Sequence, residues 1–342
     1  MNNWKKSYST NDSKKFHILL IIGIFIGILS ILLSLCFGNI TILPADLINL
    51  LSGKNMTGMT QNIFWYVRLP RTLGCIFAGA ALSVAGAILQ NVLANKLASP
   101  SIIGVNAGAG LGVTICCAFG ILSGWTISAA AFTGSLIVVL LIAIFSRHSN
   151  VSRTTVILGG VALNSILNAF SESITVLVPN VAALTTEFRV GGFSAISYPR
   201  LIPAMLLICA ALLILCTLCN ELDVIILGDD TAQSLGLPVK KYRILFLTLS
   251  ALLAGAAVSF AGLLGFVGLI VPHFIRSLIG NESRQFLPLC ILYGGTFVTI
   301  CDLISRLLFN PYELPVGILM SVIGGPLFVF LLLRYRGGHL NA

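Results

Sequence analysis

Charge is what this sequence has least of. Only 9% of its 342 residues are Asp, Glu, Lys or Arg, whereas 57% are hydrophobic. Soluble domains contain about 25% charged residues, so a soluble globular chain is excluded and an all-α integral membrane protein is indicated. The net charge of +9 comes from basic residues in short connections. That pattern is typical of membrane topology signals, and it does not indicate nucleic-acid binding.

Enzyme and metal-binding motifs are also lacking. Gly53-Lys54-Asn55 resembles the end of a phosphate-binding loop, but no Ser or Thr follows the lysine, so we expect no nucleotide site. The four histidines are scattered and form no His-Glu-x-x-His motif, which argues against a metal site. Cys216 and Cys219 form a C-x-x-C without a second pair, and we interpret all nine cysteines as packing residues. No cofactor is expected on this chain.

Long apolar runs are what the sequence has instead. The first run, residues 18–37, has no small-x-small cleavage site and is long enough to span, so it is not a cleaved signal peptide. Residues 1–16 are predicted to be a disordered cytoplasmic tail, and residues 17–342 a single transmembrane domain. At about 20 residues per crossing, ten spans are predicted, the fifth being interrupted by polar residues and the eighth short: 17–37, 72–93, 101–120, 124–145, 154–178, 201–219, 244–262, 266–279, 287–307 and 314–333.

The basic residues predict the orientation. Ten spans place both termini on one side of the membrane. With the N-terminus in the cytoplasm, 14 of the 20 Lys and Arg residues fall on the inner side, as the positive-inside rule requires. Residues 188–199 are too polar and Gly-rich to cross, and we expect a re-entrant or interfacial element there on the outer side.

Small residues predict close helix packing. Gly104, Gly108 and Gly112 repeat every four residues, and Gly79 and Gly86 are seven apart. Such spacings place glycines on one helix face, where a neighbouring helix can approach closely. They predict a multi-helix bundle and do not indicate a substrate.

The loop of residues 221–243 carries an unusual concentration of charge. Asp229-Asp230 can cap a helix start, residues 231–235 favour a short helix, and Gly236 followed by Pro238 ends it. A short capped helix presents a fixed surface to a partner in the cytoplasm; the alternative is a solvated connector. Its charged residues are Glu221, Asp223, Asp229, Asp230, Lys240, Lys241 and Arg243.

Charged residues within or next to the spans are the remaining candidates. Arg68 and Arg71 lie at an outer span end, either reaching towards lipid headgroups or forming an exposed cationic patch for an acidic partner. Asp302 and Arg306 have the spacing of a helical ion pair, which favours a structural role. Glu172 stands alone in the fifth span, and an unpaired intramembrane carboxylate indicates a water-filled pathway.

Five motifs occur together in this order: RLPRTLGCIFAGAALSVAGAILQ (68–90), LGGVALN (158–164), LGDDTAQSLGL (227–237), GFVGLIVPHFIR (265–276) and ELPVGILMSVIGGPLF (313–328). In them the chain resembles the FecCD-type permeases of type II ABC importers for iron chelates, haem and cobalamin. The resemblance runs from about residue 60 to the end.

The resemblance implies a dimer of ten-span permeases, identical or paralogous, with two cytoplasmic ATPase subunits that bind ATP and Mg. It also implies an extracytoplasmic substrate-binding lipoprotein. By the same resemblance, three sets of residues acquire roles. The residues expected to couple to the ATPase are Gly228, Asp229, Asp230, Ala232, Ser234, Leu235 and Gly236. The residues expected to dock the binding protein are Arg68, Arg71 and Arg306. The residues expected to line or gate the pathway are Ser152, Arg153, Thr154, Asn164, Asn168, Glu172, Pro315 and Gly317.

The chain departs from the family pattern in two places. Ala94-Asn95-Lys96-Leu97-Ala98 stands where relatives usually have R-N-P-L-A, and Phe188 replaces a common tryptophan. The first departure removes an arginine and a proline from that cytoplasmic turn and adds the positive charge of Lys96. Neither departure touches the docking or coupling positions.

The expected function is import of an iron(III)-siderophore as a non-enzymatic permease subunit, with haem and cobalamin as alternative cargoes. A stand-alone secondary transporter would show paired repeats with broken helices, which we do not find in the sequence. A membrane-embedded enzyme would need a nucleophile–base or metal constellation, and none is recognisable.

Overall fold

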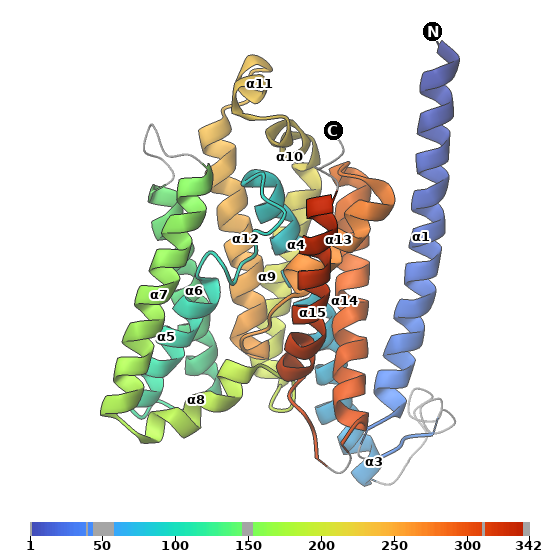
Figure 1. Ribbon diagram of the computed structural model, residues 1–342. Helices are drawn as coiled ribbons and strands as arrows, with labels where there is room; N and C mark the ends of the chain where they lie inside the picture. The colour runs from blue at the N-terminus through green and yellow to red at the C-terminus, as the bar shows by residue number, and fades with distance from the viewer. Residues whose placement is uncertain (1, 39, 44–57, 146–152, 310–311, 338–342) are drawn as a thin grey trace.

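The protein is a bundle of membrane-length helices (Figure 1). The computed structural model describes residues 2–38, 40–43, 58–145, 153–309 and 312–337, and no strand occurs among them. The helices in chain order are α1 (Asn2–Cys36), α3 (Gly58–Ile63), the π-helical turn η1 (Phe64–Arg68), α4 (Leu69–Val92), α5 (Val105–Ala118), α6 (Gly124–Phe145), α7 (Arg153–Leu177), α8 (Asn180–Val190), α9 (Tyr198–Thr217), α10 (Cys219–Ile226), α11 (Asp229–Ser234), α12 (Val239–Ala261), α13 (Val267–Ile279), α14 (Ser283–Leu307) and α15 (Val316–Gly337).

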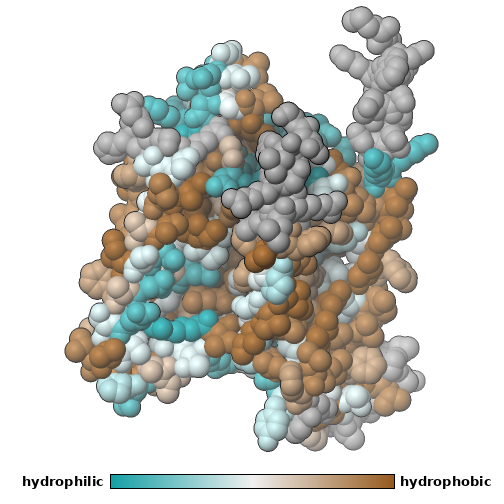
Figure 2. Space-filling view, in the orientation of Figure 1, coloured by the Kyte–Doolittle hydropathy of each residue, from teal (hydrophilic) through white to brown (hydrophobic). Residues whose placement is uncertain are grey.

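Ten of these helices correspond to the ten predicted spans. Seven are long and apolar enough to cross a membrane within the described part of the chain, and α5, α13 and α15 are shorter apolar helices. Large apolar side chains such as Phe25, Leu206 and Leu213 are exposed on the bundle, and Figure 2 shows a broad hydrophobic surface over its middle. Such a surface is suited to contact with lipid chains.

Helices α4 and α12 form the centre of the bundle. In their most apolar stretches, 83% and 72% of the residues are buried, and α4 packs against α12, α13 and α14. A Cβ atom at Gly79 would collide with the backbone of Gly294, and one at Gly86 with that of Gly268. The predicted glycine packing is therefore confirmed, although the two positions contact different helices, α14 and α13.

The third span differs from its prediction at one glycine. Gly108 and Gly112 pack against the backbone of α6 as expected. Gly104, however, precedes α5 with a φ of 91° and takes the left-handed conformation. It therefore starts the helix, but a Cβ atom there would still lie 3.2 Å from Val138 of α6, the helix that the other two glycines face.

The two chain ends lie at the same end of the bundle. In Figure 1 the N-terminus, the end of α15, α10 and α11 are at the top, whereas α3 and α8 are at the bottom. This arrangement is what an even number of crossings produces. Which of the two ends faces the cytoplasm stays a prediction.

One local prediction was wrong, whereas two others agree with the structure. Helix α1 begins at Asn2, where a disordered tail was expected, because an apolar helix can propagate into a polar flank one hydrogen bond at a time. As predicted, the element expected at 188–199 does not cross: residues 191–197 form an irregular connection in which the Gly192 amide donates to the Ala261 carbonyl. The preceding helix α8 (Asn180–Val190) runs along the bottom of the bundle (Figure 1). The fifth span is the continuous helix α7, and it is the least apolar of the seven membrane-length helices, as its polar residues predict. Hydroxyls such as those of Ser165 and Ser173 bond to its own carbonyl oxygens.

Candidate functional site: the coupling segment, the outer arginines and the open helix face

The coupling segment, which we define as residues 219–237, is built from two short helices, α10 and α11. Gly228 separates them with a φ of 106°, and Gly236 follows α11 with a φ of 83°. The Leu237 amide donates to the Ala232 carbonyl at 3.0 Å, and the Gly236 amide donates to the Gln233 carbonyl at 2.9 Å. These two bonds form a Schellman motif. The predicted short helix with its Gly stop is confirmed.

Two side-chain contacts fix this segment to the transmembrane helices. Arg243 of α12 donates from Nη2 to Asp229 Oδ1 at 2.7 Å and to Oδ2 at 2.6 Å. Asp223 of α10 accepts from the Ser283 amide at 3.0 Å and from its hydroxyl at 2.5 Å. Direct contacts therefore join α11 to α12 and α10 to α14.

The prediction that the Asp229-Asp230 pair caps α11 was wrong. Gly228 is the N-cap residue, and no side-chain cap bond is present. The Asp229 carboxylate instead pairs with Arg243, which lies largely buried beneath it. Asp229 and Asp230 still lie in the first turn, where negative charge favours the helix dipole.

The surface that the segment offers is formed by a few of the predicted coupling residues. Ala232 is fully buried beneath α11, whereas Asp230 and Ser234 are exposed. Leu235 is 63% exposed, and Leu227 is similarly open. The segment thus presents two apolar side chains and an acidic first turn on a rigid support.

The outer arginines, Arg68, Arg71 and Arg306, are brought together by three elements but are not exposed. Their exposed fractions are 5%, 6% and 2%. Arg68 donates to the carbonyl oxygens of Phe37 and Ile40, just after α1. The sequence-based patch of exposed cationic charge is therefore not found on this chain.

Two carboxylates neutralise most of this arginine cluster. Arg71 donates from Nε to both oxygens of Asp302 at 3.1 Å and from Nη1 to Glu313 at 2.6 Å. Arg306 Nε lies 3.1 Å from Asp302 Oδ2, so the predicted helical pair with Asp302 is confirmed. Arg306 also donates to the Ser34 hydroxyl at 2.8 Å. The cluster ties the end of α1 to α4 and α14, and docking stays a prediction.

The pathway residues lie mostly on an open helix face. Only 17% of the apolar stretch of α7 is buried. On it Asn168 and Glu172 are exposed and Asn164 is half-buried. Figure 2 shows hydrophilic side chains over this part of the front face. Polar groups are not left facing lipid, so this face requires a second subunit or water.

The remaining pathway residues are spread between two helix starts. Thr154 is exposed near the start of α7; Arg153 begins that helix, and Ser152 lies outside the described residues. Pro315 is exposed just before α15. Gly317 is buried, because a Cβ there would collide with the Val190 carbonyl at the end of α8.

Sequence reasoning missed several residues that hold these surfaces. Arg243, Asp223 and Glu313 were recognised as charged, but their partners lie far along the chain and no spacing rule connects them. Arg189 of α8, which donates to Ser171 Oγ on α7 at 3.0 Å, was missed for the same reason. Among the described residues, no group of three His, Cys, Asp or Glu side chains could hold a metal ion.

Comparison with known proteins decides what kind of molecule this bundle is. The model of the FecCD transport family matches residues 24–334. The chain belongs to the FecCD transport family. It is therefore a multi-pass protein of the cytoplasmic membrane and a permease subunit of an ABC importer, a subunit that is not itself a catalytic enzyme.

Individual relatives agree with the family assignment along most of the chain. The vitamin B12 import system permease BtuC of Klebsiella pneumoniae is 33% identical over 91% of this chain and 92% of its own length. The uncharacterized ABC transporter permease YvrB of Bacillus subtilis is 36% identical over 82% of each chain. A solved structure described as a metal-chelate type ABC transporter in an inward-facing conformation has a TM-score of 0.82, with 27% identity over 93% of this FecCD chain and 99% of its own.

Proposed function

We propose that this FecCD permease imports an iron(III)-siderophore complex, using ATP that is bound with Mg and hydrolysed on two separate cytoplasmic subunits. The observation that carries the ATP-driven part of this proposal is the coupling segment. It is a bounded, partly apolar surface whose Asp229–Arg243 and Asp223–Ser283 contacts join it to two transmembrane helices. A flexible loop would absorb the motion of an ATPase, whereas this segment can pass the motion into the bundle.

The open face of α7 is the proposed position of the pathway. A second permease subunit, identical or paralogous, would cover this face and enclose Asn164, Asn168 and Glu172 between the two chains. The connection at 152–155 and the start of α15 at Pro315 and Gly317 would then form gates at opposite ends. Alternating access follows if the two subunits have two packings that ATP and the loaded binding protein favour differently.

Docking of a substrate-binding lipoprotein is proposed at the end that carries the arginine cluster. Because the three guanidinium groups are buried, they support the shape of this end more than they present free charge. Glu313 is the accessible member of the cluster, with a side chain 29% exposed. An acidic side chain of the binding protein could take its place on Arg71.

Cobalamin is the second candidate cargo, because BtuC, a relative over most of the chain, is named a vitamin B12 permease. Haem is the third candidate. The rival class, a secondary transporter driven by an ion gradient, gives the coupling segment no role.

The decisive experiment measures uptake of labelled ferric siderophores, haem and cobalamin in cells that lack this permease and regain it on a plasmid. We expect ferric siderophore uptake that stops when the partner ATPase carries a hydrolysis-deficient substitution. Leu235→Asp should abolish uptake. Leu122→Asp should retain it, because Leu122 is an exposed residue of the connection between α5 and α6, and this connection lies at the opposite end of the bundle (Figure 1). Uptake of cobalamin alone would assign the second cargo. Uptake that persists without any ATPase would contradict the proposed class.

A further inference from the structure

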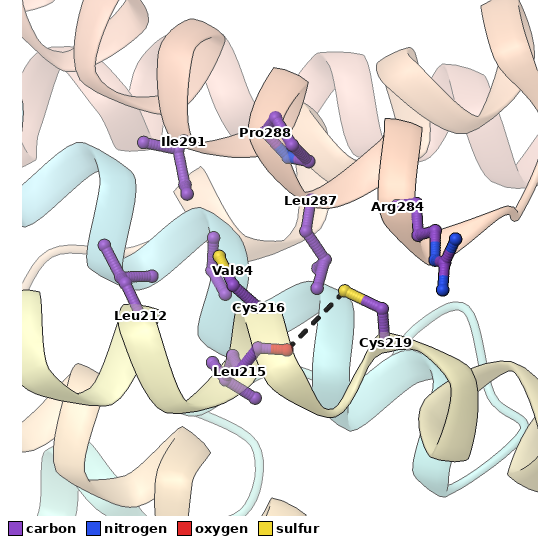
Figure 3. A pocket seen from close by; sticks show the side chains of 9 residues that line it. All are labelled: Val84, Leu212, Leu215, Cys216, Cys219, Arg284, Leu287, Pro288 and Ile291. Atoms are coloured by element: carbon purple, nitrogen blue, oxygen red, sulfur yellow. Dashed lines mark hydrogen bonds between the residues drawn. The ribbon is translucent and has the colours of Figure 1, made fainter.

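A groove on the bundle is left unused by the proposed transport cycle. It lies between α9, α10 and α14, with α4 at its floor, and has a volume of about 290 Å³. This is near the lower end of the range of small-molecule sites, about 300–1,000 Å³. One charged residue lines it, and the others are apolar or thiol side chains: Val84, Leu212, Leu215, Cys216, Cys219, Arg284, Leu287, Pro288 and Ile291 (Figure 3).

The groove opens on the surface that contacts lipid. Leu206 and Leu213 of α9 are 67% and 69% exposed, and only 28% of the apolar stretch of α9 is buried. Helix α9 lies behind the bundle in Figure 1, away from α7 and α15 at the front. The occupant of an apolar groove at this position is therefore an acyl chain, because lipid surrounds this side of a multi-pass protein.

A cationic group stands at one end of the groove. In Figure 3, Arg284 lies beside Cys219 at one end, whereas Leu212 and Ile291 lie at the other. Arg284 is exposed, and no ion-pair partner for it exists among the described residues. The Asp223 carboxylate next to it accepts two bonds from Ser283, which occupies one of its oxygens.

The position of Arg284 in its helix also suits an anion. It lies in the first turn of α14, where the helix dipole favours negative charge. This end of α14 is on the same end of the bundle as α10 and α11 (Figure 1), which is the predicted cytoplasmic end.

We propose that this groove binds one acidic phospholipid of the cytoplasmic leaflet, with its phosphate on Arg284 and an acyl chain between α9 and α14. An acyl chain gains little by leaving bulk lipid for an apolar groove, because both surroundings are equally apolar. Selectivity must therefore come from the guanidinium–phosphate contact, which is charge-assisted and can be bidentate. A net negative headgroup is favoured over a zwitterionic one, because no ammonium group then offsets the attraction to Arg284.

The test is native mass spectrometry of the full chain in a mild detergent, with phosphatidylglycerol in competition with excess phosphatidylcholine. We expect one phosphatidylglycerol per wild-type chain, and at least fivefold lower occupancy for Arg284→Gln. The phosphatidylglycerol occupancy of Arg284→Lys should be intermediate, because an ammonium group keeps the charge but cannot form the bidentate contact of a guanidinium group. Lys241→Gln is the matched control, an exposed charge on the same end that should leave occupancy unchanged.

A second variant separates the site from general surface charge. Leu212→Trp fills the apolar end and keeps Arg284, so it should also reduce phosphatidylglycerol occupancy at least fivefold. The melting temperature of each variant in detergent verifies the fold. Wild-type occupancy in either Arg284→Gln or Leu212→Trp would overturn the proposal. So would full displacement of the lipid by millimolar inorganic phosphate, because that would show a bare anion site without a chain.

Discussion

The backbone conformation at Gly236 determines the shape of the turn that ends α11 in the coupling segment. Its φ of 83° lies in the left-handed region, and a Cβ atom at this position would meet nothing within 4 Å. The requirement for glycine is therefore conformational and not a matter of space. A β-branched residue in this region costs about 1–2 kcal/mol or more, enough to disturb the turn that ends α11.

We predict that Gly236→Val abolishes uptake while the permease still inserts and still binds the loaded outer protein. The matched control is Gly120→Val, because Gly120 also has a positive φ of 69° and open space around it. Gly120 belongs to the connection between α5 and α6, which lies at the opposite end of the bundle (Figure 1). The measurement is uptake together with ATP hydrolysis in reconstituted complexes. Equal effects of the two substitutions would mean that strain, and not coupling, explains the loss.

At the scale of elements, the Asp229–Arg243 pair is the main side-chain tie between α11 and α12. Arg243 is largely buried, so removing its carboxylate leaves a buried charge that is less well compensated. A hydrogen bond to a charged group contributes about 1.5–3 kcal/mol, and the partial exposure of Asp229 places this pair near the lower value.

We predict that Asp229→Asn and Arg243→Gln each reduce uptake strongly and that the double variant is hardly worse than either single variant. The reason is that both changes remove the same tie, so their effects are not additive. A double-mutant cycle on transport-coupled ATP hydrolysis measures this. Fully additive losses would show that the two residues act independently.

The arginine cluster is a second tie between elements, and it leads to a prediction about folding. Asp302 is fully buried and contacts both Arg71 and Arg306. Breaking a buried ion pair costs about 3–5 kcal/mol, so Asp302→Asn should lower the abundance and melting temperature of the permease. Glu313→Gln removes only the more exposed partner, and its cost should be about 1 kcal/mol or less.

Quantitative blotting of membranes and thermal unfolding in detergent distinguish these two variants. The comparison also addresses docking. If Asp302→Asn leaves abundance normal and only alters binding of the outer protein, then the arginines act mainly as a docking surface and our structural interpretation fails.

At the scale of the whole molecule, the arrangement of the ends predicts accessibility. The segment containing Asp230 and both termini lie at one end of the bundle, and the connection containing Leu122 lies at the other. The charge asymmetry predicts that the first end is cytoplasmic. In a background without native cysteines, Asp230→Cys should resist an impermeant thiol reagent added to intact cells, and Leu122→Cys should react. The reverse pattern would invert the orientation.

The sequence by itself determined the class of the molecule and the position of its main elements. Apolar length sets the number of spans, because each crossing needs about 20 residues. Short-range chemistry determined the α11 helix and its Gly236 stop, because the bonds that end a helix join residues five or fewer positions apart. The family motifs, read in order, led to the same transport class as the comparisons.

Only the tertiary structure decided which charges meet. Arg71 and Asp302 are far apart in the sequence, and so are Asp223 and Ser283. The helical pattern places each charge on a helix, but the partner that neutralises it depends on which helices become neighbours. For that reason the sequence left open whether Arg68 and Arg71 form an exposed cationic patch or reach towards lipid headgroups, whereas the packing of α1, α4 and α14 buries both of them together with Arg306. The groove beside Arg284 likewise exists only because α9, α10 and α14, which are separate in the sequence, come together over α4.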